Sequence, residues 1–192
     1  MEHIELIGKT VTLLPLSEEH LLPLYEAAKP KKIWEWSATK ILSFEDAENF
    51  IKDGIESREN GLHYPFVVME NTTKQLIGST SLRSIQFSNR SLEIGSTWYH
   101  PAYWRTAVNS ECKLLLLQHS FETWSMNRVE FRTDERNIRS QTAIKRLGAV
   151  PEGILRKDKI LRDGYIRNTV VFSILMEEWP GVKNRLEGFL DR

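Results

Sequence analysis

The sequence predicts an α+β layered domain in which helices pack against a mainly antiparallel sheet. Three strand-like segments follow one another in the middle of the chain, separated by turn residues, which is typical of an antiparallel meander. Segments with helical apolar stripes alternate with strands on both sides of this meander. With 192 residues, of which 41% are hydrophobic and 27% charged, the chain can bury a full core. We therefore expect residues 1–192 to form a single domain.

The N-terminal third is predicted to hold one strand and two helices. The strand covers Thr10–Leu14 and is closed by a proline. Ser17 is a good N-cap for a helix that extends to about Lys29, and acidic residues in its first turn suit the helix dipole. Ser43 starts a second helix in the same way, which extends to about Arg58.

The rest of the chain is predicted from periodicity and turn residues. The meander consists of Tyr64–Glu70, Gln75–Ser84 and Ser91–His100. Further strands are expected at Val129–Thr133, near Gly153–Ile160 and at Tyr165–Met176. Helices are expected at Thr106–Trp124, at Ile138–Leu147 with Gly148 as the residue that ends it, and at about Val182–Phe189.

Composition excludes several classes of protein. The formal net charge is +0, which argues against nucleic acid as the main partner. No apolar stretch reaches the roughly 20 residues that span a bilayer, so we expect no membrane partner. The first residues show no secretion signal, which makes the reducing cytoplasm the expected location. Cys112 is the only cysteine and reads as a small buried hydrophobic residue. We expect a monomer or a homodimer.

The segment from Trp98 to Glu111 could hold an anion. A strand ends near His100, a proline follows, and a helix begins near Thr106. Free amides at a helix start attract anions, small residues let a phosphate approach, and Arg105 adds a charge. The alternative is a plain connection between a strand and a helix.

A second motif begins at Asn137, where a strand meets a helix. As an N-cap, Asn137 would accept a hydrogen bond from a free amide, and Ser140 lies one turn further on the same side. Simple helix capping explains this pattern as well as ligand binding does.

Together these two segments resemble the GNAT acyltransferases. Asn137, Ser140, Ala143 and Gly148 match the family pattern N-x-x-S-x-x-A-x-x-x-x-G. The predicted strand order also matches that family, which implies a three-layer domain with a mixed sheet of about seven strands. The chain looks most like the branch named for ribosomal-protein N-terminal acetyltransferases, on the cues Glu93–Gly95, Glu152–Arg156, Asp163–Tyr165 and Arg167-Asn168.

The loop that binds phosphate in this family differs here at each defining position. Where the family has Q/R-x-x-G-x-G/A, this chain has Trp104, Ala107 and Asn109. Losing glycine removes easy access to positive φ. If the loop is the first turn of a right-handed helix, alanine and asparagine can still adopt it.

The resemblance implies that acetyl-CoA binds as co-substrate, without a metal, where two neighbouring strands splay apart. The candidates are the ends of Ser91–His100 and Val129–Thr133. Backbone groups of Trp98, Tyr99 and His100 would pair with the pantetheine arm. The Asn137 side chain would also bond the pantetheine. The pyrophosphate would be held by the amides of Arg105, Thr106, Ala107, Val108, Asn109 and Ser110.

The reaction requires a base for the amine and a proton donor for the departing thiolate. Many GNAT enzymes use a tyrosine as the donor, but that position is Ile144 here, so Ser140 is the candidate. Glu93 is the candidate base, with a surface ion pair as the alternative. Ser173 is a further candidate on the substrate side. His100 precedes a proline and is more consistent with a structural role.

Trp34 and Trp36 fall between the first two helices, a region that borders the acceptor site in this fold. They could line a substrate slot, although we favour a role as a roof over the core. The function predicted is transfer of an acetyl group from acetyl-CoA to a primary amine, with a protein N-terminal amine favoured. The alternatives are a small-molecule amine acetyltransferase and a catalytically weak CoA-binding regulatory protein.

Overall fold

The computed structural model describes residues 3–191 and contains one eight-stranded sheet in the order β1-β2-β3-β4-β5-β6-β8-β7. All neighbouring strands are antiparallel except β5 and β6, which are parallel. The strands are β1 Leu6–Ile7, β2 Val11–Pro15, β3 His63–Glu70, β4 Leu76–Gln86, β5 Ser91–Tyr99, β6 Arg128–Asp134, β7 Val150–Ile160 and β8 Ile166–Leu175.

Five α-helices and several single turns connect these strands. The helices are α1 Leu21–Ala28, α2 Phe44–Glu59, α3 Val108–Gln118, α4 Ile138–Leu147 and α5 Trp179–Leu190. Short 3₁₀ turns are η1 Glu18–His20, η2 Lys31–Trp34, η3 Pro101–Tyr103 and η5 Met176–Glu178, and η4 His119–Thr123 is a π-helical turn. Among the described residues, none of these helices is long and apolar enough to cross a bilayer.

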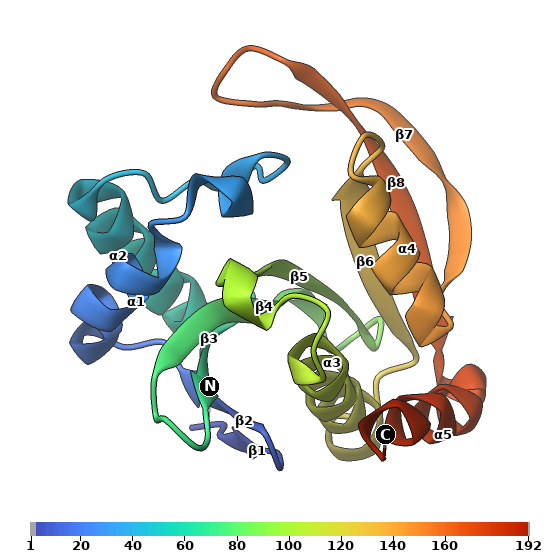
Figure 1. The fold of residues 1–192 in the computed structure, drawn as a ribbon. Helices are drawn as coiled ribbons and strands as arrows, with labels where there is room; N and C mark the ends of the chain where they lie inside the picture. Colours follow the sequence, from blue (N-terminus) through green and yellow to red (C-terminus); the bar gives the residue numbers. More distant parts are fainter. Residues whose placement is uncertain (1–2, 192) are drawn as a thin grey trace.

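Two hydrophobic cores lie on opposite faces of the sheet. Successive side chains along a strand point to opposite faces and therefore belong to different cores. On β3, Phe66 and Val68 belong to the core that contains residues of α3, α4 and α5, whereas Val67 belongs to the core that contains residues of α1 and α2. Helices therefore flank the sheet on both sides, with α1 and α2 beside β3 and β4 in Figure 1. This arrangement has three layers.

The parallel pair β5 and β6 opens into a wedge. Their register covers three residue pairs, from Ser91 with Arg128 to Glu93 with Glu130. Beyond Glu93, β5 continues along β4, while β6 continues along β8 as far as Asp134. Figure 1 shows the two strands diverging. The predicted splay between these two strands is confirmed.

The predicted fold class is confirmed, with two differences in detail. The sheet has eight strands rather than about seven, because the two-residue strand β1 is too short to carry a periodic signal. The long helix expected at Thr106–Trp124 is α3 followed by the π-helical turn η4. Cys112 lies on α3 and is fully buried, and desolvation raises the pKa of its thiol to about 12.

Candidate functional site

The β5 side of the wedge contains a β-bulge. Gly95 pairs with Ser81 and Trp98 with Ser79, so three steps along β5 oppose two steps along β4. Ser96 has a φ of 48°, which a side-chain-bearing residue rarely adopts. A bulge leaves one backbone position outside the ladder. An amide that the ladder does not use can therefore bond a ligand in the wedge.

The residues from Trp98 to His100 do not all face the wedge as predicted. The His100 N–H donates to Ile77 O at 2.7 Å and the His100 carbonyl accepts from Tyr103 N, so both backbone groups of His100 already have a protein partner. Alternation turns the Trp98 backbone towards β4 as well, so its predicted pairing with the pantetheine arm stays a prediction. Tyr99 faces the wedge, where its carbonyl already accepts from Trp104 Nε1 at 2.9 Å. The same alternation turns the Tyr99 N–H towards the wedge, where the pantetheine arm is predicted to lie.

The start of α3 leaves several amides open. Thr106 Oγ1 accepts from Val108 N at 3.3 Å, and the first intrahelical bond runs from Glu111 N to Ala107 O at 2.9 Å. Within the described chain, the N–H groups of Ala107, Asn109 and Ser110 have no protein acceptor. Such amides fit an anion.

The missing glycines do not distort this helix start. Ala107 has right-handed helical angles, φ −64° and ψ −21°, and Asn109 lies inside α3. The positive φ falls instead on Arg105, at 64°. The loop therefore keeps its shape without glycine, at the cost of strain at Arg105.

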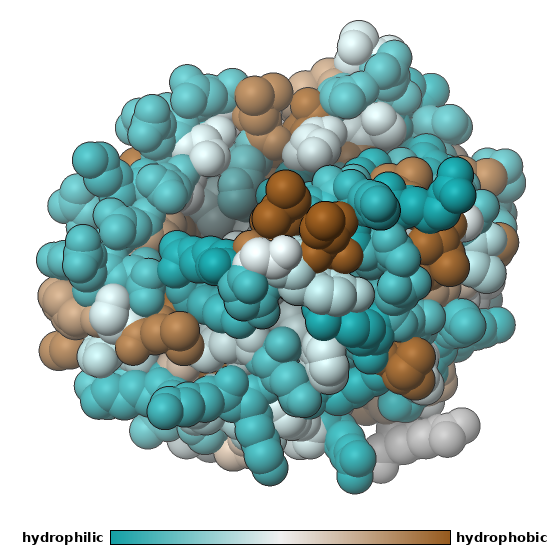
Figure 2. Space-filling view, turned by 90° about the horizontal axis from the view of Figure 1, so that it is seen from above, coloured by the Kyte–Doolittle hydropathy of each residue, from teal (hydrophilic) through white to brown (hydrophobic). Residues whose placement is uncertain are grey.

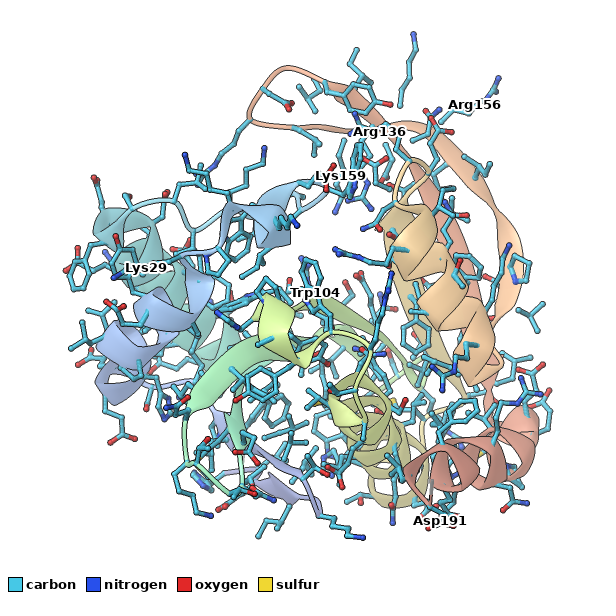
Figure 3. The ribbon with its side chains drawn as sticks, viewed as in Figure 1. Lys29, Trp104, Arg136, Arg156, Lys159 and Asp191 are labelled. Carbon is cyan, nitrogen blue, oxygen red and sulfur yellow. The ribbon has the colours of Figure 1, made fainter. Side chains whose placement is uncertain are left out.

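The start of α4 faces the wedge from the other side. Asn137 Oδ1 accepts from Ser140 N at 2.9 Å, so the predicted capping role is confirmed. In the described structure, Asn137 Nδ2 and the Ser140 hydroxyl bond no protein group. Both can therefore reach a ligand. Arg139 lies over the Trp104 ring at 4.0 Å, so α4 and the loop before α3 touch across the wedge; Figure 3 shows Trp104 there.

Glu93 lies where the pairing of β5 with β6 ends. It is in register with Arg83 on β4 and Glu130 on β6, on the sheet face of α1 and α2. Its side chain is 14% exposed, and Arg132 Nε lies 4.0 Å from Glu93 Oε2. A Cβ on Gly95 would come within 2.4 Å of Glu93 Oε1, so glycine at this position makes room for the carboxylate.

Cations surround the Glu93 carboxylate. Arg83 and Arg167 come from β4 and β8, and Lys159 is in register with Arg167. Arg167 is 7% exposed and its buried Nε lacks a hydrogen-bond partner among the described residues. Partial desolvation, together with repulsion from Arg83 and Arg167, lowers the pKa of Lys159.

Ser173 shares this sheet face but is already engaged. It is in register with Glu130 and is 3% exposed. Its hydroxyl donates to Glu152 Oε1 at 2.9 Å, and Glu152 is paired with Arg128. Hydrogen bonding to Arg128 lowers the pKa of Glu152. The structure thus places Ser173 in an ion-pair ladder, which gives it a structural role alongside the predicted catalytic one.

The two tryptophans before α2 have different surroundings. Trp34 is 3% exposed, donates from Nε1 to Ala28 O at 2.9 Å and packs 5.1 Å from the Trp98 ring, so it is a roof over the core. Trp36 is partly exposed and Arg136 lies 5.0 Å from its ring centre. Arg136 also lies 3.4 Å from the ring centre of Tyr165 in the β7–β8 hairpin.

A second contact joins the hairpin to the helical side. Arg162 Nη1 donates to Asp46 Oδ1 on α2 at 3.1 Å. Figure 1 shows the hairpin and the α1–α2 segment on opposite sides of the upper end of the wedge. Figure 2 looks onto this end of the molecule and shows a hollow with a mostly hydrophilic rim. This end is the candidate acceptor entrance.

Sequence reasoning missed four side chains of the site: Arg83, Trp104 as an indole donor, Lys113 and Arg139. Only Lys113 gave a usable signal, since it lies between Cys112 and the apolar run Leu114–Leu117 on α3. The other three take their roles from contacts between distant segments. Among the described residues, no group of three or more His, Cys, Asp or Glu could hold a metal ion.

Comparison with known proteins identifies the class. The profile of the "Acetyltransferase (GNAT) domain" matches residues 10–150. The chain belongs to the GNAT acetyltransferase family. It is an acetyl-CoA-dependent N-acetyltransferase, and an amine is its acceptor.

Individual relatives agree with this assignment. The chain is 23% identical over 163 residues to the ribosomal-protein-serine acetyltransferase of Escherichia coli (strain K12), covering 83% of this chain and 89% of that protein. A crystal structure of a putative acetyltransferase from T. thermophilus superposes with a TM-score of 0.87 at 33% identity, over 98% of this chain and 97% of that one. A GCN5-related N-acetyltransferase from Brucella melitensis gives a TM-score of 0.91 at 26% identity, over 99% and 86%.

Proposed function

We propose that the acceptor is the α-amine of a polypeptide N-terminus. The observation that carries this proposal is Glu93, a carboxylate at the narrow end of the wedge with Arg83, Lys159 and Arg167 around it. A single ammonium group can pair with Glu93. A polyamine, with several positive charges, would be repelled by the surrounding cations.

The relatives support the same acceptor. The Escherichia coli protein is named for ribosomal-protein serine acetylation, and it aligns with most of this chain. The open hollow at the hairpin end offers room for a chain that continues beyond its first residue.

In this proposal each residue has one task. Glu93 binds the ammonium and accepts its proton, which leaves a neutral amine to attack the thioester carbonyl carbon. The backbone amide that the β5 bulge leaves outside the ladder donates a hydrogen bond to the carbonyl oxygen of the thioester. The carbon–sulfur bond then breaks, and the Ser140 hydroxyl lies on the side from which a proton reaches the sulfur. The amides at the start of α3 hold the pyrophosphate, and Asn137 Nδ2 bonds the pantetheine.

The test is an acceptor panel read by mass spectrometry. Short peptides with free N-terminal serine, alanine or methionine are compared with their N-formylated copies, which retain a lysine side chain, and with spermidine. We expect acetylation of the free N-termini only. Faster acetylation of spermidine, or of the lysine in the formylated peptides, would contradict the proposal.

Glu93→Gln tests the role of the carboxylate. The substitution keeps the shape but removes the charge that binds the ammonium, so kcat/KM for the peptide should fall about 100-fold. The Kd for acetyl-CoA should stay the same in calorimetry. Glu48→Gln on α2 is the matched control. A Glu93→Gln variant with the turnover of the unmodified protein would remove Glu93 from the mechanism.

A further inference from the structure

Two cations hold the β5 bulge from opposite faces of the sheet. Arg83 Nη1 donates to Ser96 Oγ at 2.9 Å. Lys113 Nζ donates to Thr97 Oγ1 at 2.8 Å. Arg83 is in register with Glu93, on the face of α1 and α2, whereas Lys113 belongs to α3 on the other face. The two bulge residues are thus fixed by two different positive side chains.

Lys113 is an unusual residue for the interior. It is 5% exposed, and its second acceptor is Thr80 Oγ1 at 3.5 Å. Thr80 and Thr97 also bond each other at 2.7 Å, so they can satisfy one another without the lysine. No carboxylate in the described part of the chain lies within 4.0 Å of Lys113 Nζ. A buried cation without a counter-ion opposes folding.

The groups near Lys113 do not neutralise it. Burial lowers the pKa of Lys113 to about 8, so most molecules still carry the charge at pH 7. The neighbouring Cys112 thiol and the Tyr99 hydroxyl on β5 both have raised pKa values, because burial disfavours their charged forms. Glu111 accepts from three amides of the β1–β2 turn, at Lys9, Thr10 and Val11. The Lys113 ammonium therefore has no carboxylate partner among the described residues.

We propose that Arg83 and Lys113 are positioning residues that clamp the β5 bulge and keep positive charge where the thioester oxygen becomes negative. This inference rests on the proposed placement of the acetyl group in the wedge. When the amine attacks, electrons of the carbonyl double bond move onto the oxygen, and they return when the carbon–sulfur bond breaks. A backbone amide that is held in place between two cations stabilises the negatively charged oxygen more than a mobile amide does.

The main test replaces Lys113 with methionine. Because Lys113→Met removes a buried charge, we expect a higher Tm together with a fall in kcat of about 10-fold or more, while the Kd for acetyl-CoA changes less than about 3-fold. A lysine with a merely structural role would give a lower Tm instead. Lys52→Met, at an exposed position of α2, is the control and should change none of the three values.

A second pair of variants tests the same contact from the bulge. Thr97→Val removes the hydroxyl with little change in shape and should lower kcat in the same way, whereas Thr97→Ser keeps the hydroxyl and should restore most of the rate. This pair decides the question if Lys113→Met does not fold. An unchanged kcat in Lys113→Met, or in Thr97→Val, would overturn the proposal.

An acceptor-independent measurement separates this inference from the proposed function. Infrared difference spectra of acetyl-CoA labelled with ¹³C at the carbonyl should show a shift to lower frequency on binding, and Lys113→Met should reduce that shift. An equal shift in both proteins would refute the clamp. A protein that shows the shift but acetylates no peptide refutes the proposed acceptor and leaves the clamp standing.

Discussion

The two helices that begin at the wedge, α3 and α4, start in different ways. At α4, the Asn137 side chain caps the Ser140 amide at 2.9 Å. At α3, the amides of Ala107, Asn109 and Ser110 have no acceptor among residues 3–191, and the side-chain cap in that range is the longer bond from Val108 N to Thr106 Oγ1, at 3.3 Å. A helix start whose free amides are capped by its own side chains can present other side-chain groups to a ligand. A helix start whose amides have no protein acceptor can bind an anion directly. This difference supports the proposal that the pyrophosphate binds at α3 and the pantetheine at α4.

Among the variants that test this comparison of the two helices, the largest effect should come from giving α3 a capping side chain like that of α4. Thr106→Asp places a capping carboxylate over the open amides, where it also repels the pyrophosphate. We expect the Kd for acetyl-CoA to rise about 30-fold, roughly 2 kcal/mol, while the free energy of unfolding rises by about 0.5 kcal/mol. Calorimetry and urea unfolding measure the two values.

Thr106→Asn is the control for this prediction, because it has the shape of aspartate without the charge. It should weaken binding much less. Equal binding by the Asp variant and the unmodified protein would show that the pyrophosphate does not lie at α3.

Ser140→Ala tests whether the open hydroxyl of α4 serves the chemistry. The amide of residue 140 keeps its cap, so folding should not change. We expect kcat to fall about 10-fold while the Kd for acetyl-CoA stays within about 2-fold. Thr142→Ala is the matched control, since that hydroxyl bonds Ile138 O within the helix. If the turnover rate is unchanged, Ser140 has no part in catalysis.

Asn137 caps α4 and is proposed to bind acetyl-CoA as well, and two substitutions separate these roles. Asn137→Ala removes both, so the free energy of unfolding should fall by about 1 kcal/mol and acetyl-CoA should bind about 5-fold more weakly. Asn137→Ser keeps a capping oxygen but lacks the Nδ2 group, so it should weaken binding alone. If Asn137→Ser binds acetyl-CoA as tightly as the unmodified protein, Asn137 acts only as a helix cap.

The smallest effect concerns the strain at Arg105. Glycine adopts a φ of 64° without penalty, although it costs more entropy on folding. Arg105→Gly should therefore raise the free energy of unfolding by about 0.5 kcal/mol relative to Arg105→Ala, which lacks the charge but keeps the strain. Equal stability of the two variants would mean that this backbone position is relaxed.

Local signals in the sequence predicted the features that depend on local structure. Apolar periodicity located the strands and helices, and the Ser43 and Asn137 caps marked helix starts correctly, because capping involves residues only three positions apart. The splay between β5 and β6 was predicted from the resemblance to GNAT acyltransferases and not from apolar periodicity.

Features set by contacts between distant segments could not be predicted. The positive φ at Ser96 comes from the mismatch between β4 and β5, and serine itself gives no sign of it. The Trp104 indole occupies the Tyr99 carbonyl only because of how the loop before α3 folds back. The charge around Glu93 comes from β4 and from the β7–β8 hairpin, which lie far apart in the sequence.

The contacts of the β7–β8 hairpin restrict the direction from which an acceptor can arrive. Arg136 stacks between Trp36 and Tyr165, and Arg162 ties the hairpin to Asp46, so the protein forms a closed arch beside the wedge. A polypeptide can enter the space beneath a closed arch only with its free end first. The middle of a folded chain has no such end. Under the function proposed above, an N-terminus would enter beneath this arch end-on, and the contacts of Arg136 and Arg162 would set the width of that entrance.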